Sequence, residues 1–237
     1  MIRKIRLLIS LCSIGVSMFC ASSSARVEHN REAVEILKGI SVASSISEPS
    51  YQVPWPDGSL MAQGPVIMGK KNGKWKLFSK GSDGGSLIAE ADFKNDILDG
   101  VFKEYYPSGK LKTVINYRAG IPHGSSMTFY ESGIGHIERN YQNGIVSGKA
   151  MEYYDNGNIK ENSFYRNGVR DGAATFFYRN GKRQALGRYI EGKKNGLWEH
   201  FHENGFLKER GAYKDDVKVG VWTLYDDLGH PKGEVRH

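Results

Sequence analysis

The sequence predicts an all-β protein: an elongated, single antiparallel β-meander of about seven 24-residue hairpin repeats, preceded by a short N-terminal helix and linker. Three observations predict this fold. Glycines return at a fixed interval of 24 residues, aromatic residues return in the same register, and turn-forming Asn-Gly or Ser-Gly pairs lie between strand-like arms. The composition agrees, because 29 glycines, 13 tyrosines and 10 phenylalanines suit short strands joined by tight turns.

The glycines and aromatic residues form five columns whose members are spaced by 24 residues, except that Phe78 lies 27 residues before Tyr105. The first glycine column is Gly100, Gly124, Gly148, Gly172, Gly196, Gly220, and the second is Gly109, Gly133, Gly157, Gly181, Gly205, Gly229. The third is Gly120, Gly144, Gly168, Gly192, with Asp96 and Asp216 in that position at its two ends. The aromatic columns are Phe78, Tyr105, Phe129, Tyr153, Phe177, Phe201, Tyr225 and Phe93, Tyr117, Tyr141, Tyr165, Tyr189, Tyr213.

The array extends backward from these columns. Gly73 opens an earlier unit whose turn carries three extra residues, and Asp57-Gly58 marks half a unit before it. The predicted domains are therefore a signal peptide at 1–25, a polar spacer at 26–50 and the repeat array at 51–237. At about 10 Å of sheet per hairpin, seven and a half units predict a body roughly 70 Å long.

Each unit is predicted to be a hairpin followed by a second turn. In the unit that begins at Gly148, the arms are 149–154 and 158–166, and the turns lie at 155–157 and 167–168. Glycine at these turns accepts the positive φ that a tight hairpin requires. Alternation along a strand places Trp222 and Leu224 on one face and Val221 and Tyr225 on the other.

The repeat resembles the MORN repeat, and especially its bacterial variant. Residues 196–201 and 220–225, with Trp198 and Trp222, carry the opening of that motif, and residues 110–112 and 158–160 carry the stretch after the turn. Bacterial proteins of this kind are commonly labelled YwqK-family antitoxins, so the resemblance implies inhibition of a toxin by direct binding. MORN arrays elsewhere are linked to membrane contact and protein scaffolding. Two units depart from the pattern, since Ser126 and Ala174 occupy the tryptophan position.

The N-terminus is predicted to direct export. Three basic residues within 3–6 precede an apolar run at 7–19 and a stretch of small residues at 21–25, which is the anatomy of a secretory signal peptide. Cys20 leaves an alternative open, because a cysteine after such a run resembles the acylated cysteine of a bacterial lipoprotein, although Phe19 departs from that pattern. We expect a periplasmic, cell-envelope or secreted protein. The alternative is an outer-membrane lipoprotein that carries a lipid on Cys20.

The spacer contains one helical pattern. Residues 28–38 fit about three turns, with Val34, Ile36 and Leu37 on one side, and we expect this helix to lie outside the repeat. The Ser-rich stretch 41–50 reads as a linker.

The residues do not predict catalysis, a metal or a cofactor. Both cysteines, Cys12 and Cys20, precede the array, and motifs typical of nucleophilic or phosphate-binding sites are missing. His200 and His202 are two apart on one expected strand face, but a third ligand is not evident. The glycine-rich run 69–74 looks like a phosphate loop, yet it is a turn of the repeat.

The predicted function is therefore non-catalytic binding or scaffolding of a protein partner. The formal charge of +7 includes three basic residues of the signal peptide, so charge gives little support to nucleic-acid binding. A membrane surface is an alternative partner, reached through basic turns such as Lys193-Lys194 or through a lipid on Cys20. Antitoxin-like inhibition is the third reading, and it follows from the resemblance.

Overall fold

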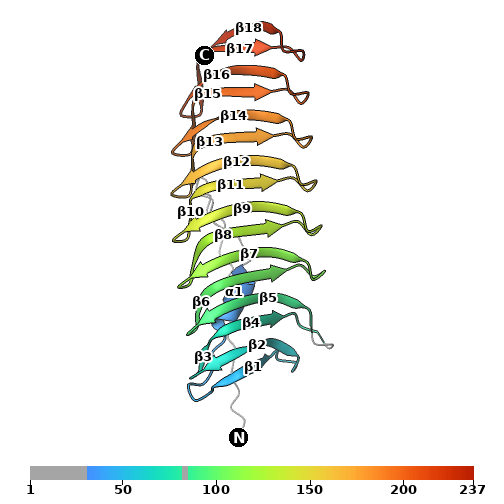
Figure 1. Ribbon diagram of the computed structural model, residues 1–237, viewed down its shortest axis with the longest axis vertical. Coiled ribbons are helices and arrows are strands. Elements are labelled where there is room, and N and C mark those ends of the chain that lie inside the picture. The colour runs from blue at the N-terminus through green and yellow to red at the C-terminus, as the bar shows by residue number, and fades with distance from the viewer. Residues whose placement is uncertain (1–30, 82–84) are drawn as a thin grey trace, which may run out of the picture.

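The computed structural model describes residues 31–81 and 85–237, and there it confirms the predicted all-β meander. One open sheet of 18 strands rises from the N-terminal hairpin to the C-terminus, and one short helix lies on it (Figure 1). The predicted signal peptide at 1–25 and Cys20 lie outside the described residues.

The strands have the following bounds: β1 Glu48–Pro54, β2 Leu60–Ile67, β3 Lys70–Lys71, β4 Gly73–Phe78, β5 Leu87–Lys94, β6 Ile97–Tyr105, β7 Leu111–Arg118, β8 Ile121–Phe129, β9 Gly135–Gln142, β10 Ile145–Val146, β11 Gly148–Tyr153, β12 Ile159–Arg166, β13 Val169–Phe177, β14 Arg183–Ile190, β15 Lys193–Phe201, β16 Leu207–Lys214, β17 Val217–Tyr225 and β18 Pro231–Arg236.

Apart from the short strands β3 and β10, each strand pairs antiparallel with the strand before it and the strand after it, so β1 and β18 are the edges of the sheet. The short strands β3 and β10 begin the arms that β4 and β11 continue, and all four pair with the preceding long strand. Strand β1 begins at Glu48, inside the segment expected as a spacer, and forms a full hairpin with β2 around Asp57 and Gly58.

The turns have the backbone geometry that their sequences predict. Gly157 closes the hairpin between β11 and β12 with φ of 86°, and its N–H donates to the Tyr154 carbonyl at 2.9 Å. The following turn, Asn167-Gly168, has φ of 50° and 82°, which is the pair of positive values that two-residue hairpin loops need. These turns hold consecutive strands in register along the whole array.

A register shift recurs near the end of the first arm of each hairpin. In β15 the shift falls between His200 and Phe201, and the strand ends at Phe201. His202 therefore leaves the strand and its ring faces the Tyr225 carbonyl, whereas the His200 ring lies between Trp198 and Trp222. The expectation that the two histidines share a strand face is wrong, because alternation does not continue through the irregularity.

Hydrogen bonds from tyrosine hydroxyls link successive hairpins. After β6, β8, β11 and β13, the next residue is a tyrosine that donates its hydroxyl to the main-chain carbonyl 23 residues later, at 2.7–2.8 Å. The donor and acceptor pairs are Tyr106 and Phe129, Tyr130 and Tyr153, Tyr154 and Phe177, and Tyr178 and Phe201. The acceptor is the residue at the register shift, so the hydroxyl satisfies a carbonyl at the point where the ladder is irregular.

We expect Tyr154→Phe to lower the free energy of unfolding by about 1 kcal/mol, because it leaves the Phe177 carbonyl without this donor. Tyr153→Phe is the matched control, since its hydroxyl contacts an exposed Glu138 carboxylate at 3.2 Å. Urea titration of both variants checks this, and equal costs for the two changes would contradict the role of this hydrogen bond.

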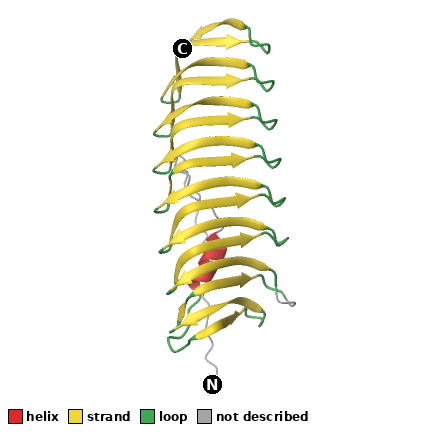
Figure 2. Ribbon diagram, in the orientation of Figure 1, coloured by secondary structure: helices red, strands yellow, loops and turns green. Residues whose placement is uncertain are grey.

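The helix α1, Arg31–Gly39, packs on one face of the sheet instead of standing apart from it (Figure 2). Ala33, Val34, Leu37 and Ile40 are buried in one apolar cluster with side chains of β2 and β4–β7. The pattern of apolar residues predicted the helix, but not the surface that covers it. In the part of the chain that the structure describes, no helix is long and apolar enough to cross a membrane.

Candidate functional site: the tryptophan face

One face of the sheet, here called the tryptophan face, carries the side chains that lie two residues after Gly73 and after each glycine of the first column. These side chains are all buried, whatever their size. They are Trp75, Phe102, Ser126, Ala150, Ala174, Trp198 and Trp222. The second predicted aromatic column, from Phe93 to Tyr213, lies on this same face, because Tyr189 and Tyr213 pack edge-on against Trp198.

Glycines of the preceding strand make room for the tryptophans. A Cβ atom added to Gly187 would lie 2.3 Å from the indole of Trp198, and one added to Gly211 would lie 2.3 Å from Trp222. The indole N–H groups donate to main-chain carbonyls beside these glycines, at 3.2 Å for Trp198 and 3.1 Å for Trp222. Large residues thus lie over small ones across neighbouring strands, which is how a pleated surface reaches close packing.

The N-terminal part of this face is covered by α1. Trp75, Leu77 and Phe102 are buried in the cluster that includes Leu37 of the helix. Lys71 is 2 % exposed, and its Nζ donates to the carbonyl of Ile40, the residue that follows the helix. A buried ammonium requires partners, and this carbonyl is one of them.

Asp96 is the second partner of Lys71. Its carboxylate lies 3.1 Å from Lys71 Nζ and also accepts the Lys71 main-chain N–H at 2.8 Å. Burial by itself would raise the pKa of Asp96, but the hydrogen bonds from Lys71 and its charge hold the pKa below its ordinary value. We call Lys71, Trp75 and Asp96 site 1.

A second set of the same residues lies in the C-terminal part of the array. Residues 193–198 read Lys-Lys-Asn-Gly-Leu-Trp, and residues 70–75 read Lys-Lys-Asn-Gly-Lys-Trp. Asp216 accepts the Lys194 main-chain N–H at 2.8 Å, and both Asp96 and Asp216 have positive φ, of 68° and 69°. We call Lys194, Trp198 and Asp216 site 2.

The cover over site 2 differs from the cover over site 1. Trp198 and Trp222 belong to a separate apolar cluster, and the partly buried residues packed against it, Phe176 and Tyr213, come from the sheet itself. Lys194 Nζ lies over the rings of Trp198 at 4.7 Å and Tyr213 at 5.0 Å. Within the described residues, the helix lies over β4–β6 and not over this cluster.

A groove of about 420 Å³ opens at site 2, and we call it the C-terminal groove. Aromatic and basic side chains predominate along it. Its lining is Phe176, Tyr178, Gln184, Ala185, Tyr189, Lys194, Trp198, His200, Phe201, Lys208 and Glu209. Such a mixture of aromatic surface and a few charged groups is typical of a recognition surface.

His200 lies in the floor of the groove. Its ring stacks on Trp198 with centroids 6.0 Å apart, and its Nε2 is buried without a hydrogen-bond partner among the described residues. Burial lowers the pKa of His200 below its ordinary value of 6.5, and the nearby lysines add to this while Glu209 opposes it.

The lowered pKa predicts that acid weakens the fold. Because the unfolded chain binds a proton at His200 more readily than the folded chain, the free energy of unfolding should fall as pH drops through 6.5. His136, whose pKa burial also lowers, contributes in the same window. Urea midpoints at about pH 7.5 and about pH 5.5 measure this dependence, which His200→Gln should reduce. An unchanged dependence in His200→Gln would contradict the assignment.

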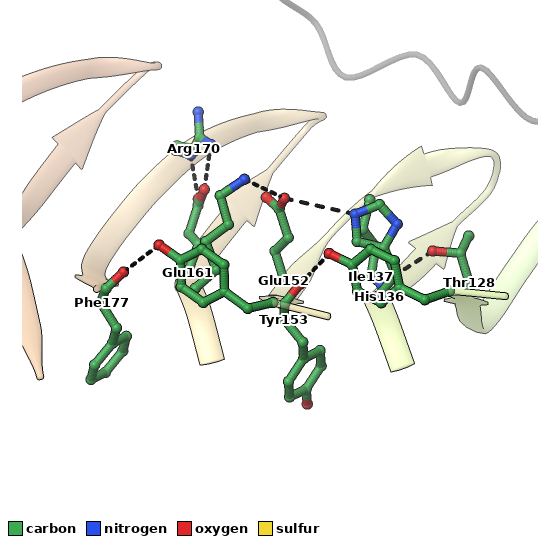
Figure 3. A network of polar contacts seen from close by, with 11 residues as sticks. Thr128, His136, Ile137, Glu152, Tyr153, Glu161, Arg170 and Phe177 are labelled. Carbon is green, nitrogen blue, oxygen red and sulfur yellow. Dashed lines mark hydrogen bonds and ion pairs between the residues drawn. The ribbon is translucent and has the colours of Figure 1, made fainter. Parts of the chain in front are cut away.

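The middle of the tryptophan face is polar, and small residues occupy the tryptophan position there. Arg170 donates to both carboxylate oxygens of Glu161, at 2.7 and 2.8 Å (Figure 3). Ser163 donates to the same carboxylate. The Arg170 guanidinium lies 5.7 Å from the rings of both Tyr165 and Tyr189. An ion pair between two aromatic rings thus fills this part of the face, next to the C-terminal groove.

Glu161 stays ionised in this environment. Burial would raise the pKa of its carboxyl, but the hydrogen bonds from Arg170 and Ser163 and the Arg170 charge hold the pKa below its ordinary value. Among residues 31–81 and 85–237, no three His, Cys, Asp or Glu side chains are grouped in a way that could hold a metal ion.

Sequence reasoning found the columns but not their roles. The repeat-signature glycines lie at the turns and inside the strands. The first aromatic column lies at the register shifts, as Phe201 does, whereas the second column packs on the tryptophan face. The relation between sites 1 and 2 was missed, although the shared run Lys-Lys-Asn-Gly-x-Trp and the two aspartates in the glycine position were signals for it.

This open meander of similar hairpins defines a β-repeat protein, in which each unit packs mainly on its neighbours. The family model for the MORN repeat variant matches residues 98–119, 147–167, 170–191 and 194–215. The chain therefore contains MORN repeats of this variant type, and the YwqK-family label stays a prediction.

Comparison with curated proteins gives no match. Among solved structures, the chain is similar to one titled a glycosylation-associated protein (Gap123) complex from Streptococcus agalactiae, at 21 % identity and a TM-score of 0.28. The similarity covers 43 % of this chain and 18 % of that one, so this chain spans less than a fifth of that structure's length.

Proposed function

We propose that this protein is a non-catalytic binding module whose recognition surface is the C-terminal groove. The observation that carries the proposal is the pair of related sites. Site 1 has a helix packed on it, whereas site 2 has the same lysine, tryptophan and aspartate beside a groove of about 420 Å³. Because the same three residue types occupy equivalent positions at both sites, we expect a protein segment to pack at site 2 as α1 packs at site 1.

The electrostatics of the groove favour a partner with negative or carbonyl-rich surface. Arg170, Lys194, Lys208 and Lys218 lie in or beside it, and Glu209, itself paired with Lys218 at 2.8 Å, is the acidic group in its lining. Aromatic rings beside these cations supply apolar contact area. Such a surface combines hydrophobic burial with charge complementarity, which gives a binding site both affinity and orientation.

Site-specific photocrosslinking in the native cell envelope tests this function. A photoreactive phenylalanine in place of Gln184 lies in the lining of the groove, and one in place of Leu197, which is 56 % exposed and alternates with Trp198, reports the opposite face. We expect a discrete protein adduct from position 184 and none from position 197. Adducts from position 197 alone, or from neither position, would contradict the proposal.

The compartment is part of the same proposal. Export through residues 1–25 would expose the groove to partners of the envelope or the exterior. Mass spectrometry of the mature N-terminus distinguishes cleavage near residues 23–25 from a lipid on Cys20.

A further inference from the structure

Site 1 shows how this sheet holds the end of a helix. The C-terminal carbonyl groups of a helix lack partners within the helix and carry partial negative charge, so a cation is favourable beside them. Lys71 supplies that cation, because its Nζ donates to the Ile40 carbonyl just beyond α1. Leu37, one turn earlier, is fully buried against the sheet.

The two lysines share part of their surroundings, although Lys71 also forms an ion pair with Asp96 at 3.1 Å. Lys71 lies over the Phe93 ring at 5.5 Å, and Lys194 lies over the corresponding Tyr213 ring at 5.0 Å. The aspartate that accepts the main-chain N–H of the lysine also donates its own N–H to the lysine carbonyl, at 3.0 Å in site 1 and 3.1 Å in site 2. The backbone therefore presents both side chains from the same position on the sheet.

The two ammonium groups differ in what they bind. Lys71 is directed to the helix end, whereas Lys194 lies over the Trp198 indole at 4.7 Å, a contact with the edge of the groove. A cation over an aromatic ring at a partly exposed site contributes little, so a stronger acceptor can draw Lys194 away from it.

We propose that site 2 binds the C-terminal end of an amphipathic helix of a partner protein, in the manner in which site 1 holds α1. This inference rests on the proposed function of the C-terminal groove and names its ligand. Lys194 would donate to the last carbonyls of the helix, and an apolar side chain one turn earlier would enter the groove between Phe176 and His200. The helix is apolar on one side, with acidic residues beside Lys208 and Lys218.

A peptide of this chain is the direct probe. The labelled peptide of residues 31–47 carries α1 and its C-terminal end, and fluorescence anisotropy measures its binding to the full-length protein. We expect saturable binding, weakened about fivefold or more by Lys194→Met, the size of effect typical of a charge at a helix terminus. Methionine keeps the apolar stem of the side chain, and circular dichroism confirms that the variant is folded.

Matched variants locate the binding. Lys193→Met removes the neighbouring exposed lysine and should leave the affinity within about twofold. Leu37→Asp in the peptide should abolish binding, because Leu37 is the buried contact of α1. Loss of binding in Lys71→Met but not in Lys194→Met would mean that the peptide exchanges with α1 at site 1, and it would overturn the inference.

Failure of this inference can be told from failure of the proposed function. Absence of peptide binding up to about 1 mM, or affinity that does not depend on Lys194, overturns the helix-end inference. If the crosslink from position 184 persists in that case, the groove binds a protein in another way. If the crosslink is also absent, the groove is not a binding surface.

Discussion

Replacing Trp198 with alanine is expected to lower the free energy of unfolding by about 3–5 kcal/mol, the cost of removing a large buried aromatic side chain. Trp198 is fully buried, donates to the Arg188 carbonyl and contacts the rings of Phe176, Tyr189, His200 and Tyr213. Gly187→Val disturbs the same packing from the neighbouring strand. It should lower the free energy of unfolding by about 3 kcal/mol, because the added Cβ would lie 2.3 Å from the indole.

A double-mutant cycle separates this packing from other effects. Gly187 has no positive φ, so its backbone tolerates a side chain and the clash with Trp198 is the expected source of the cost. In the Trp198→Ala background, Gly187→Val should therefore cost far less than in the native chain. Urea unfolding monitored by circular dichroism gives the four free energies, and strict additivity would contradict the size matching between neighbouring strands.

Breaking the Arg170–Glu161 pair is expected to have the second largest effect. Arg170→Met leaves the Glu161 carboxylate, which is 11 % exposed, with Ser163 as its remaining side-chain donor. We expect a loss of about 2–3 kcal/mol, less than for a fully buried pair because Arg170 is 35 % exposed. The control Arg166→Met removes a 72 % exposed arginine from Asp171 and should cost under about 0.5 kcal/mol.

The pair also has a pH signature. The pKa of Glu161 is below its ordinary value of 4.5 in the folded chain, so its stabilising contribution is present above 4.5 and is lost as pH falls through the folded pKa. Arg170→Met should remove this contribution, and Arg166→Met should keep it. Equal loss of stability in both variants at neutral pH would contradict the role of the buried pair.

The architecture was predictable from the sequence because the signals for it are local and repeated. Asn167-Gly168 specifies a tight turn, and the glycine of that turn recurs every 24 residues from Gly120 to Gly192, which fixes the strand lengths between turns. Because successive units are similar, each hairpin packs on the next in the same way and with the same strand register. The meander and its strand order follow from these facts.

The functional features were less accessible because they depend on contacts between distant segments. The pattern of Val34 and Leu37 predicted a helix, but nothing in its spacing states that it packs on Trp75. The register shift after His200 breaks the alternation that a strand pattern assumes, so His202 was placed on the wrong face. Site 2 is defined by likeness to site 1, whose role is visible through the Lys71 contact with Ile40.

Hydrogen–deuterium exchange of the full-length chain, with and without the residue 31–47 peptide, tests most directly whether the C-terminal groove is an uncovered equivalent of the α1 site. We expect slower exchange in β14–β17, Arg183–Tyr225, on peptide addition, and no change in β4–β6 beneath α1. Slower exchange confined to β4–β6, or no change anywhere at saturating peptide, would contradict this expectation.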